Sequence, residues 1–144
     1  MSGVTIVDTD ILIDAGRQVR EAIDCLNRIE ERSMLAISVI THMELLVGCR
    51  NKTELRSVEL FLQRFQVVTL SEKVCAVAIE LLRRYRLSHG LLIPDALIAA
   101  TAMELKFSFV SKNQRDYRYI SKLQLLTYPD LLASQKVAPP MRQG

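Results

Sequence analysis

The chain has 144 residues, of which 49% are hydrophobic and 24% charged, and its formal net charge at pH 7 is +3. This length and composition are typical of one globular domain with its own hydrophobic core, and they argue against a disordered chain. Five glycines and four prolines exclude a collagen-like repeat, a Pro-rich linker and a Gly-rich phosphate loop. The slight excess of basic residues permits a polyanionic partner without requiring one.

The cysteines and histidines argue against thiol and imidazole chemistry. Cys25, Cys49 and Cys75 form no CxxC pair, which argues against a disulfide framework and a thiolate zinc site. His42 and His89 are too few for a histidine metal cluster, and we expect neither to be catalytic. The sequence shows no signal-peptide pattern and no run of 18 apolar residues, so we expect a cytoplasmic protein. Carboxylates are the chemistry that remains.

Short apolar runs alternate with helical patterns along the chain. Strands are predicted over residues 4–7, 34–37, 65–70, 107–111 and 123–126. Helices are predicted from near residue 10, and over residues 17–32, 39–49, 53–64, 72–87, 94–105 and 129–133. This alternation predicts an α/β fold over residues 1–133, a three-layer α/β/α domain with a mostly parallel sheet of four or five strands, in an order left open. Residues 134–144 are predicted to form a flexible tail.

Most of the 16 acidic residues lie on helix faces that we expect to be solvated, and four are placed differently. Asp8 directly follows the first strand. Ligands of open parallel sheets bind at the carboxyl ends of strands, so this position favours a functional site. The alternative is that Asp8 caps the helix that follows. The two roles are compatible.

Of the other three acids, two lie on helices that we expect to flank the strands, and one follows a strand. Glu44 shares a helix face with Thr41, which favours a functional role. The alternative is an ordinary surface residue. Asp95 follows Pro94 in the first turn of an alanine-rich helix, where close packing would hold it rigidly and where the helix dipole also favours an acid. Asp116 lies just beyond the fourth strand, where it would belong to the same site. The alternative is that it is part of an ordinary polar loop.

If these four acids converge, a cation is needed to hold them together. Two carboxylates 4 Å apart repel each other by about 4 kcal/mol at an effective dielectric constant of 20. An all-oxygen acidic site suits a hard ion such as Mg²⁺ or Mn²⁺. Such an ion can activate water and clamp a phosphodiester for in-line attack, which is nuclease chemistry.

Four segments of the chain resemble, in order and spacing, the motifs of PIN-domain ribonucleases and, more narrowly, of the VapC toxins of toxin–antitoxin pairs. They are VDTDILID (residues 7–14), SVITHMELLVG (38–48), IPDALIAATA (93–102) and VSKNQRDY (110–117). The resemblance covers nearly the whole chain up to about residue 132. It implies a PIN-like fold and a Mg²⁺- or Mn²⁺-dependent endoribonuclease that acts as a toxin.

The resemblance also implies roles for particular residues. The catalytic acids would be Asp8, Glu44, Asp95 and Asp116, with Asp8, Asp95 and Asp116 coordinating the metal and Glu44 completing the shell or orienting water. Polar residues beside the metal or the substrate would be Thr9, Asp10, Ser111 and Asn113. Two positions depart from the usual pattern. Asp10 replaces Asn or Ser, which adds a charge and could alter metal affinity, and Ser111 replaces Thr, which keeps the hydroxyl.

Basic residues near the predicted site suit an RNA substrate. We expect Lys112, Arg115 and Arg86 to contact phosphates, although the arginines at the end of the helix over residues 72–87 could instead form a solvated helix end. Members of the family are inhibited by a small antitoxin and typically dimerise, so a VapB-like or other antitoxin and a homodimer are expected, and no membrane.

Two other functions remain open from the sequence. Asp8-Thr9-Asp10 after a strand is similar to the start of haloacid-dehalogenase-like phosphatases, in which Asp8 would be a nucleophile. That motif expects a hydroxyl residue two positions after the second Asp, where this chain has Leu12. The second alternative is a PIN-like module that binds RNA or a partner without cleaving, against which the retention of all four acids argues.

Overall fold

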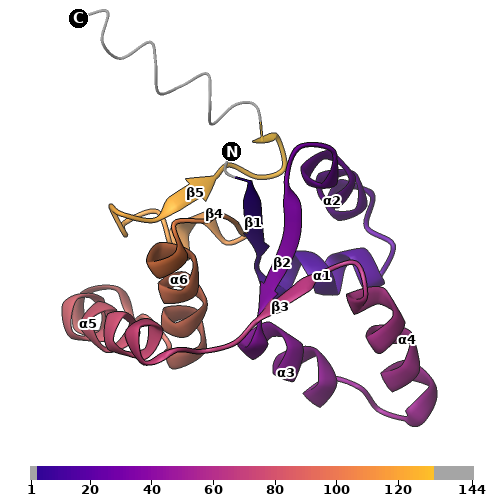
Figure 1. Cartoon of the computed structure of the whole chain (residues 1–144), viewed down its shortest axis with the longest axis horizontal. Helices are drawn as coiled ribbons and strands as arrows, with labels where there is room; N and C mark the ends of the chain where they lie inside the picture. Colours follow the sequence, from indigo (N-terminus) through magenta and orange to yellow (C-terminus); the bar gives the residue numbers. More distant parts are fainter. Residues whose placement is uncertain (1–2, 132–144) are drawn as a thin grey trace, which may run out of the picture.

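The computed structural model describes residues 3–131 and shows one five-stranded parallel sheet with helices on both faces (Figure 1). The strands are β1 (Val4–Val7), β2 (Met34–Ser38), β3 (Gln66–Val68), β4 (Ser108–Val110) and β5 (Gln124–Leu126). Their order is β3-β2-β1-β4-β5, so β1 is central and pairs in parallel with β2 and β4. The predicted α/β class and parallel sheet are confirmed. Residues 132–144 lie outside the described residues, and with them the last two residues of the helix predicted over 129–133 and the whole predicted tail.

Six helices and one 3₁₀ turn connect the strands. They are α1 (Thr9–Gly16), α2 (Arg20–Arg32), α3 (Val39–Val47), α4 (Lys52–Leu62), α5 (Glu72–His89), α6 (Ile93–Leu105) and η1 (Gln114–Asp116). The prediction that a helix begins at residue 17 is wrong by three residues. Gln18 has a φ of 66°, in the left-handed region, and this separates α1 from α2.

Alternate residues of the central strands supply two separate hydrophobic cores. Ile6 of β1 and Phe109 of β4 pack against α5 and α6. Val7 and Val110, the next residues along the same strands, pack on the other face against α1 and α2. This period of two follows from the strand pleat, and it explains why consecutive apolar residues of one strand are buried in different cores.

The alanines of α6 are all buried, as the sequence predicted for a closely packed helix. Ala96, Ala99, Ala100 and Ala102 lie in the core formed by the sheet, α5 and α6. Their small side chains let α6 approach its neighbours closely, so Asp95 in the first turn is fixed by a rigid element. No helix within residues 3–131 is long and apolar enough to span a membrane.

Phe109→Ala tests the account of this core. Phe109 is fully buried and makes an edge-to-face contact with Tyr117, with ring centroids 4.8 Å apart. We expect the substitution to lower the free energy of unfolding by about 3–5 kcal/mol, because it leaves a cavity. Leu60→Ala on exposed α4 should change it by less than about 0.5 kcal/mol. Urea denaturation measures both, and similar losses in the two variants would contradict the assignment.

Candidate active site

Asp8 joins the central strand to the first helix and is buried at this junction, with 6% of its surface exposed. Its Oδ1 accepts a hydrogen bond of 2.9 Å from the Thr9 backbone N–H, so it is the N-cap of α1. Its Oδ2 accepts a 2.7 Å hydrogen bond from the Ser111 hydroxyl, which is fully buried after β4. Burial, followed by the neighbouring charge of Asp10, raises the pKa of Asp8 to about 7. Asp8 therefore both caps α1 and lies at the end of the central strand, as the sequence predicted.

Asp10 binds the loop that follows β4. Its carboxylate accepts hydrogen bonds from the backbone N–H groups of Lys112 at 3.3 Å and Asn113 at 3.1 Å, and the Ser111 hydroxyl lies 3.3 Å away. Burial raises the pKa of Asp10, while the two backbone donors oppose that rise. The extra acid in this motif thus fixes the β4–η1 loop to the start of α1.

Thr9 connects Asp8 to Glu44 on a separate helix. The Thr9 hydroxyl donates a 2.7 Å hydrogen bond to Glu44 Oε1, and it lies 2.9 Å from the hydroxyl of buried Thr41. Thr41 and Glu44 are both on α3, whose N-cap is Ser38, the last residue of β2. These contacts hold Glu44, an exposed residue, toward the end of β1. The sequence placed Thr41 and Glu44 on one helix face but gave no sign that Thr9 bonds to them.

Asp95 lies within electrostatic range of the other acids. Its pKa is raised first by burial and then by the charges of Asp116, Glu44 and Asp10, and Asp95 in turn raises the pKa of Asp8. We call these residues the acidic cluster: Asp8, Asp10, Glu44, Asp95 and Asp116. All four acids singled out in the sequence thus lie in one electrostatic neighbourhood, although they come from β1, α3, α6 and η1.

Tyr117 is a buried residue of this neighbourhood that the sequence did not single out. Burial, then the charges of Asp8 and Asp95, raise its pKa far above the ordinary value, so its hydroxyl keeps its proton. The hydroxyl is near enough to lower the pKa of Asp95, but within the described chain it makes no hydrogen bond of acceptable distance and angle. A buried hydroxyl without a hydrogen-bond partner is costly, so Tyr117 adds to the unfavourable burial of polar groups at this place.

The side chains do not converge on a single ion position. Within residues 3–131, no three Asp, Glu, His or Cys side chains are close enough together to ligate one metal ion. The donor set nevertheless fits a hard cation, because it consists of carboxylates and hydroxyls alone. The raised pKa values of Asp8, Asp10 and Asp95 have burial as their first cause, and repulsion from other acids of the cluster adds to it at Asp8 and Asp95. A positive charge among these groups would favour the ionised carboxylates and so oppose the rise of all three pKa values.

The three basic residues expected at RNA differ in what they contact. Lys112 Nζ donates to Asp14 Oδ2 at 2.8 Å, at the edge of the acidic cluster. Arg115 lies in η1 and is exposed. Arg86 donates from Nη1 to the backbone oxygens of Gly90 at 3.0 Å and Leu91 at 3.2 Å. Arg86 therefore has a structural role at the end of α5 that the sequence did not reveal.

Buried Asp8 makes the stability of the metal-free protein depend on pH. In the folded state its carboxyl keeps a proton up to about pH 7, whereas the unfolded chain loses that proton above about 3.8. The folded state thus binds more protons between these values, so the free energy of unfolding falls as pH rises across the interval, by a few kcal/mol in order of magnitude. Urea denaturation in EDTA from pH 4 to 8 measures the slope.

Asp8→Asn provides the control for this prediction. The variant should show a flatter pH profile and exceed the parent in stability at pH 8, because no buried charge forms. Part of the slope should remain, since the pKa values of Asp10 and Asp95 are raised as well. A parent protein whose stability increases through this interval would contradict the account.

Comparison with known proteins places the chain in a family. Residues 5–123 match the PIN domain family. Ribonuclease VapC10 of Mycobacterium tuberculosis is 41% identical over 98 residues, which are 67% of this chain and 73% of that protein. A toxin–antitoxin complex from Klebsiella pneumoniae superimposes with a TM-score of 0.72 at 29% identity, over 88% of this chain and 98% of that one. The VapBC2 complex of Rickettsia felis, bound to a promoter DNA fragment, superimposes with a TM-score of 0.72 at 26% identity, over 85% of this chain and 96% of that one.

The match spans most of the chain and includes the strand ends and helix starts that carry the acidic cluster. It sets aside the phosphatase alternative, and the structure agrees, because Leu12 is buried in the core and the Asp10 carboxylate is bound to backbone N–H groups. The chain belongs to the PIN-domain family, in its VapC branch.

Proposed function

We propose that this protein is a metal-dependent endoribonuclease and the toxin of a toxin–antitoxin pair. The observation that carries the proposal is the acidic cluster, in which buried Asp8 and half-buried Asp95 are brought together from β1 and α6 with three further acids around them. The relative that is 41% identical is named a ribonuclease, which supports RNA as the substrate class. The solved toxin–antitoxin complexes support an antitoxin partner.

Asp8, Asp95 and Asp116 would hold Mg²⁺ or Mn²⁺, directly or through water, and Glu44 would complete the shell or orient the attacking water. When bound, such an ion activates water and neutralises charge that develops on a phosphodiester. The residues around the acids keep them in place. Ser111 donates to Asp8, Thr9 donates to Glu44, and Asp10 fixes the loop that carries Asn113 and Asp116.

Lys112 and Arg115 lie beside the acidic cluster, on the loop after β4 and in η1, where they would contact the phosphates on either side of the scissile bond. Such contacts position a nucleic acid without reading its sequence. The non-cleaving alternative predicts RNA binding alone, and no observation on the described residues favours it over cleavage.

Asp95→Asn tests the catalytic proposal. We expect RNA cleavage in Mg²⁺ or Mn²⁺ to fall by about 100-fold or more, because the variant loses a charge from the centre of the acidic cluster. EDTA should abolish cleavage by the parent. Glu31→Gln, on the exposed face of α2, is the matched control and should cleave as the parent does. Undiminished cleavage by folded Asp95→Asn protein would refute the metal-site assignment, and RNA bound but left intact by the parent would establish the binding module.

Growth on induction tests the toxin proposal separately. Expression of the parent should arrest bacterial growth, whereas Asp8→Asn and Asp95→Asn should not, because they lose the cleavage activity. Co-expression of the product of a short adjacent reading frame should restore growth to the parent. Arrest by the parent and by both variants alike would show that toxicity has another cause.

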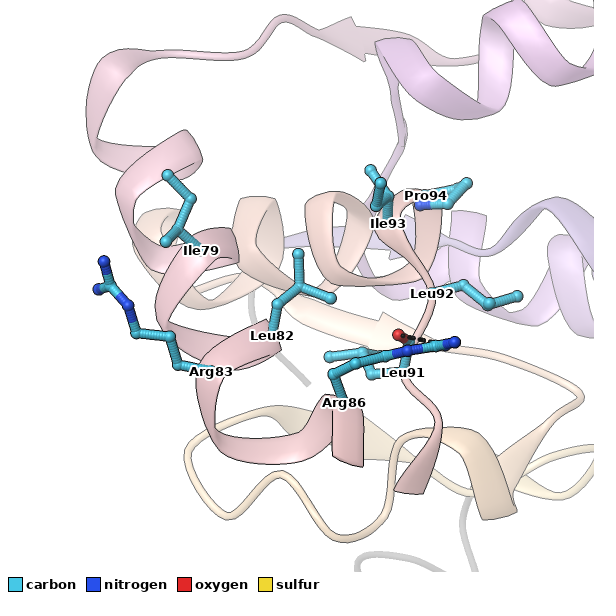
Figure 2. Close-up of a pocket in the computed structure, with 8 residues that line it drawn as sticks. All are labelled: Ile79, Leu82, Arg83, Arg86, Leu91, Leu92, Ile93 and Pro94. Atoms are coloured by element: carbon cyan, nitrogen blue, oxygen red, sulfur yellow. Dashed lines mark hydrogen bonds between the residues drawn. The ribbon is translucent and has the colours of Figure 1, made fainter. Parts of the chain in front are cut away.

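We also propose that the protein forms a homodimer through an apolar face of α5 and the start of α6. Figure 2 shows Ile79 and Leu82 on one side of a cavity of about 760 Å³, and Leu92, Ile93 and Pro94 on the other. Ile79, Leu92 and Ile93 are 50%, 55% and 66% exposed. Contiguous apolar side chains of this size are typical of an interface, and a second copy of the chain would cover them.

Ile79→Glu tests this face, because it places a charge there while keeping a helix-forming residue in α5. We expect the parent to have the mass of two chains by light scattering during gel filtration, and the variant that of one. Ile13→Glu, on α1 and also exposed, should remain dimeric. A parent that is monomeric at all concentrations would refute the dimer.

A further inference from the structure

Three aromatic rings pack together where α5 ends, beside the acidic cluster. The rings of His89 and Tyr119 are stacked, with centroids 3.9 Å apart and planes 15° from parallel. Tyr85 packs against both, at 4.8 Å from Tyr119 and 5.8 Å from His89. His89 is exposed, whereas Tyr85 and Tyr119 are half-buried. The two tyrosines of this aromatic group therefore pack against the protein, and the imidazole of His89 is exposed to solvent.

This stack faces two of the acids across a small cavity. The cavity has a volume of about 180 Å³, and its walls include His89 and Tyr119 together with Asp95 and Asp116. The pKa of Tyr119 is raised by burial and then by these same two acids, in agreement with their proximity. A space smaller than the roughly 300 Å³ of the smallest usual ligand pockets suits one flat ring system rather than a whole nucleotide.

The chain around His89 is fixed by hydrogen bonds. Gly90 ends α5 in the left-handed region, with a φ of 73°, a conformation that a residue with a side chain rarely adopts. Arg86 holds the turn through its bonds to the Gly90 and Leu91 carbonyl oxygens, and Figure 2 shows it lying along this turn. The Ser88 hydroxyl lies 2.8 Å from His89 Nδ1 and orients the ring. The stack is thus positioned before any ligand arrives.

We propose that the His89–Tyr119 stack is a platform for a base of the RNA, beside the acidic cluster. The proposal rests on the proposed ribonuclease function. A base on the imidazole would extend an existing stack at the cavity whose walls include Asp95 and Asp116. Base–aromatic stacking strengthens binding with little dependence on sequence. His89 and Tyr119 are positioning residues, which contact the nucleotide without taking part in the bond change.

The test separates binding of bases from binding of phosphates. Fluorescence anisotropy in EDTA compares labelled oligoadenylate with the matching abasic ribose–phosphate oligomer. We expect the parent to prefer oligoadenylate by about tenfold, the magnitude that stacking of a single base supplies. His89→Ala should lose most of this preference and bind the abasic oligomer as the parent does. His89→Phe keeps a flat ring and should retain the preference. Leu87→Ala, two residues before His89 and 99% exposed, should behave as the parent.

Equal binding of the two oligomers by the parent, or a full preference in His89→Ala, would overturn the platform. Cleavage in Mn²⁺ is measured in parallel. A parent that prefers oligoadenylate through His89 but cleaves no RNA would support the platform and refute the nuclease. A parent that cleaves RNA while His89→Ala keeps both the preference and the cleavage rate would refute the platform and leave the nuclease standing.

Discussion

The Asp8 carboxylate, buried where the central strand ends and the first helix begins, is the constraint on which the site depends. Its two oxygens bond to the Thr9 backbone and to the Ser111 hydroxyl, so one side chain joins β1, α1 and the end of β4. A carboxylate with only 6% of its surface exposed is unfavourable as an anion, and this is why its pKa rises to about 7. The fold holds Asp8 in a place where its charge lowers stability, which is common for functional groups.

The other acids increase that cost. Asp95 and Asp10 are also partly buried, and the charges of the cluster oppose one another's ionisation. The buried hydroxyl of Tyr117 lies among them without a hydrogen-bond partner in the described chain. A divalent cation would favour the ionised carboxylates, and the stability lost by gathering these groups would become affinity for the metal. The same constraint thus predicts a loss of stability at high pH without metal and supports the proposed activity with it.

Much of the fold could be predicted from local patterns. The apolar run ending at Asp8, the Ser38 cap and the alanines after Asp95 each reflect interactions between residues near in sequence or a simple strand or helix period. The residues that the sequence did not reveal act across long separations. Tyr117 meets Asp8 only after the sheet has formed, and Thr41 meets Thr9 across 32 residues. The strand order stayed open for the same reason, and the left-handed Gln18 gave no local sign, because the residue is not a glycine.

The most direct test of the account is the pKa of Asp8 itself, measured from the ¹³C chemical shift of its carboxyl carbon as pH is varied. In EDTA the account predicts a pKa of about 7, and addition of Mg²⁺ should lower it, because the cation favours the ionised form. The carboxyl carbon of Asp24, on α2 and outside the acidic cluster, serves as the internal reference for an effect of Mg²⁺ on carboxylates in general. An Asp8 pKa close to 3.8 in EDTA, or one that Mg²⁺ leaves unchanged, would contradict the central claim.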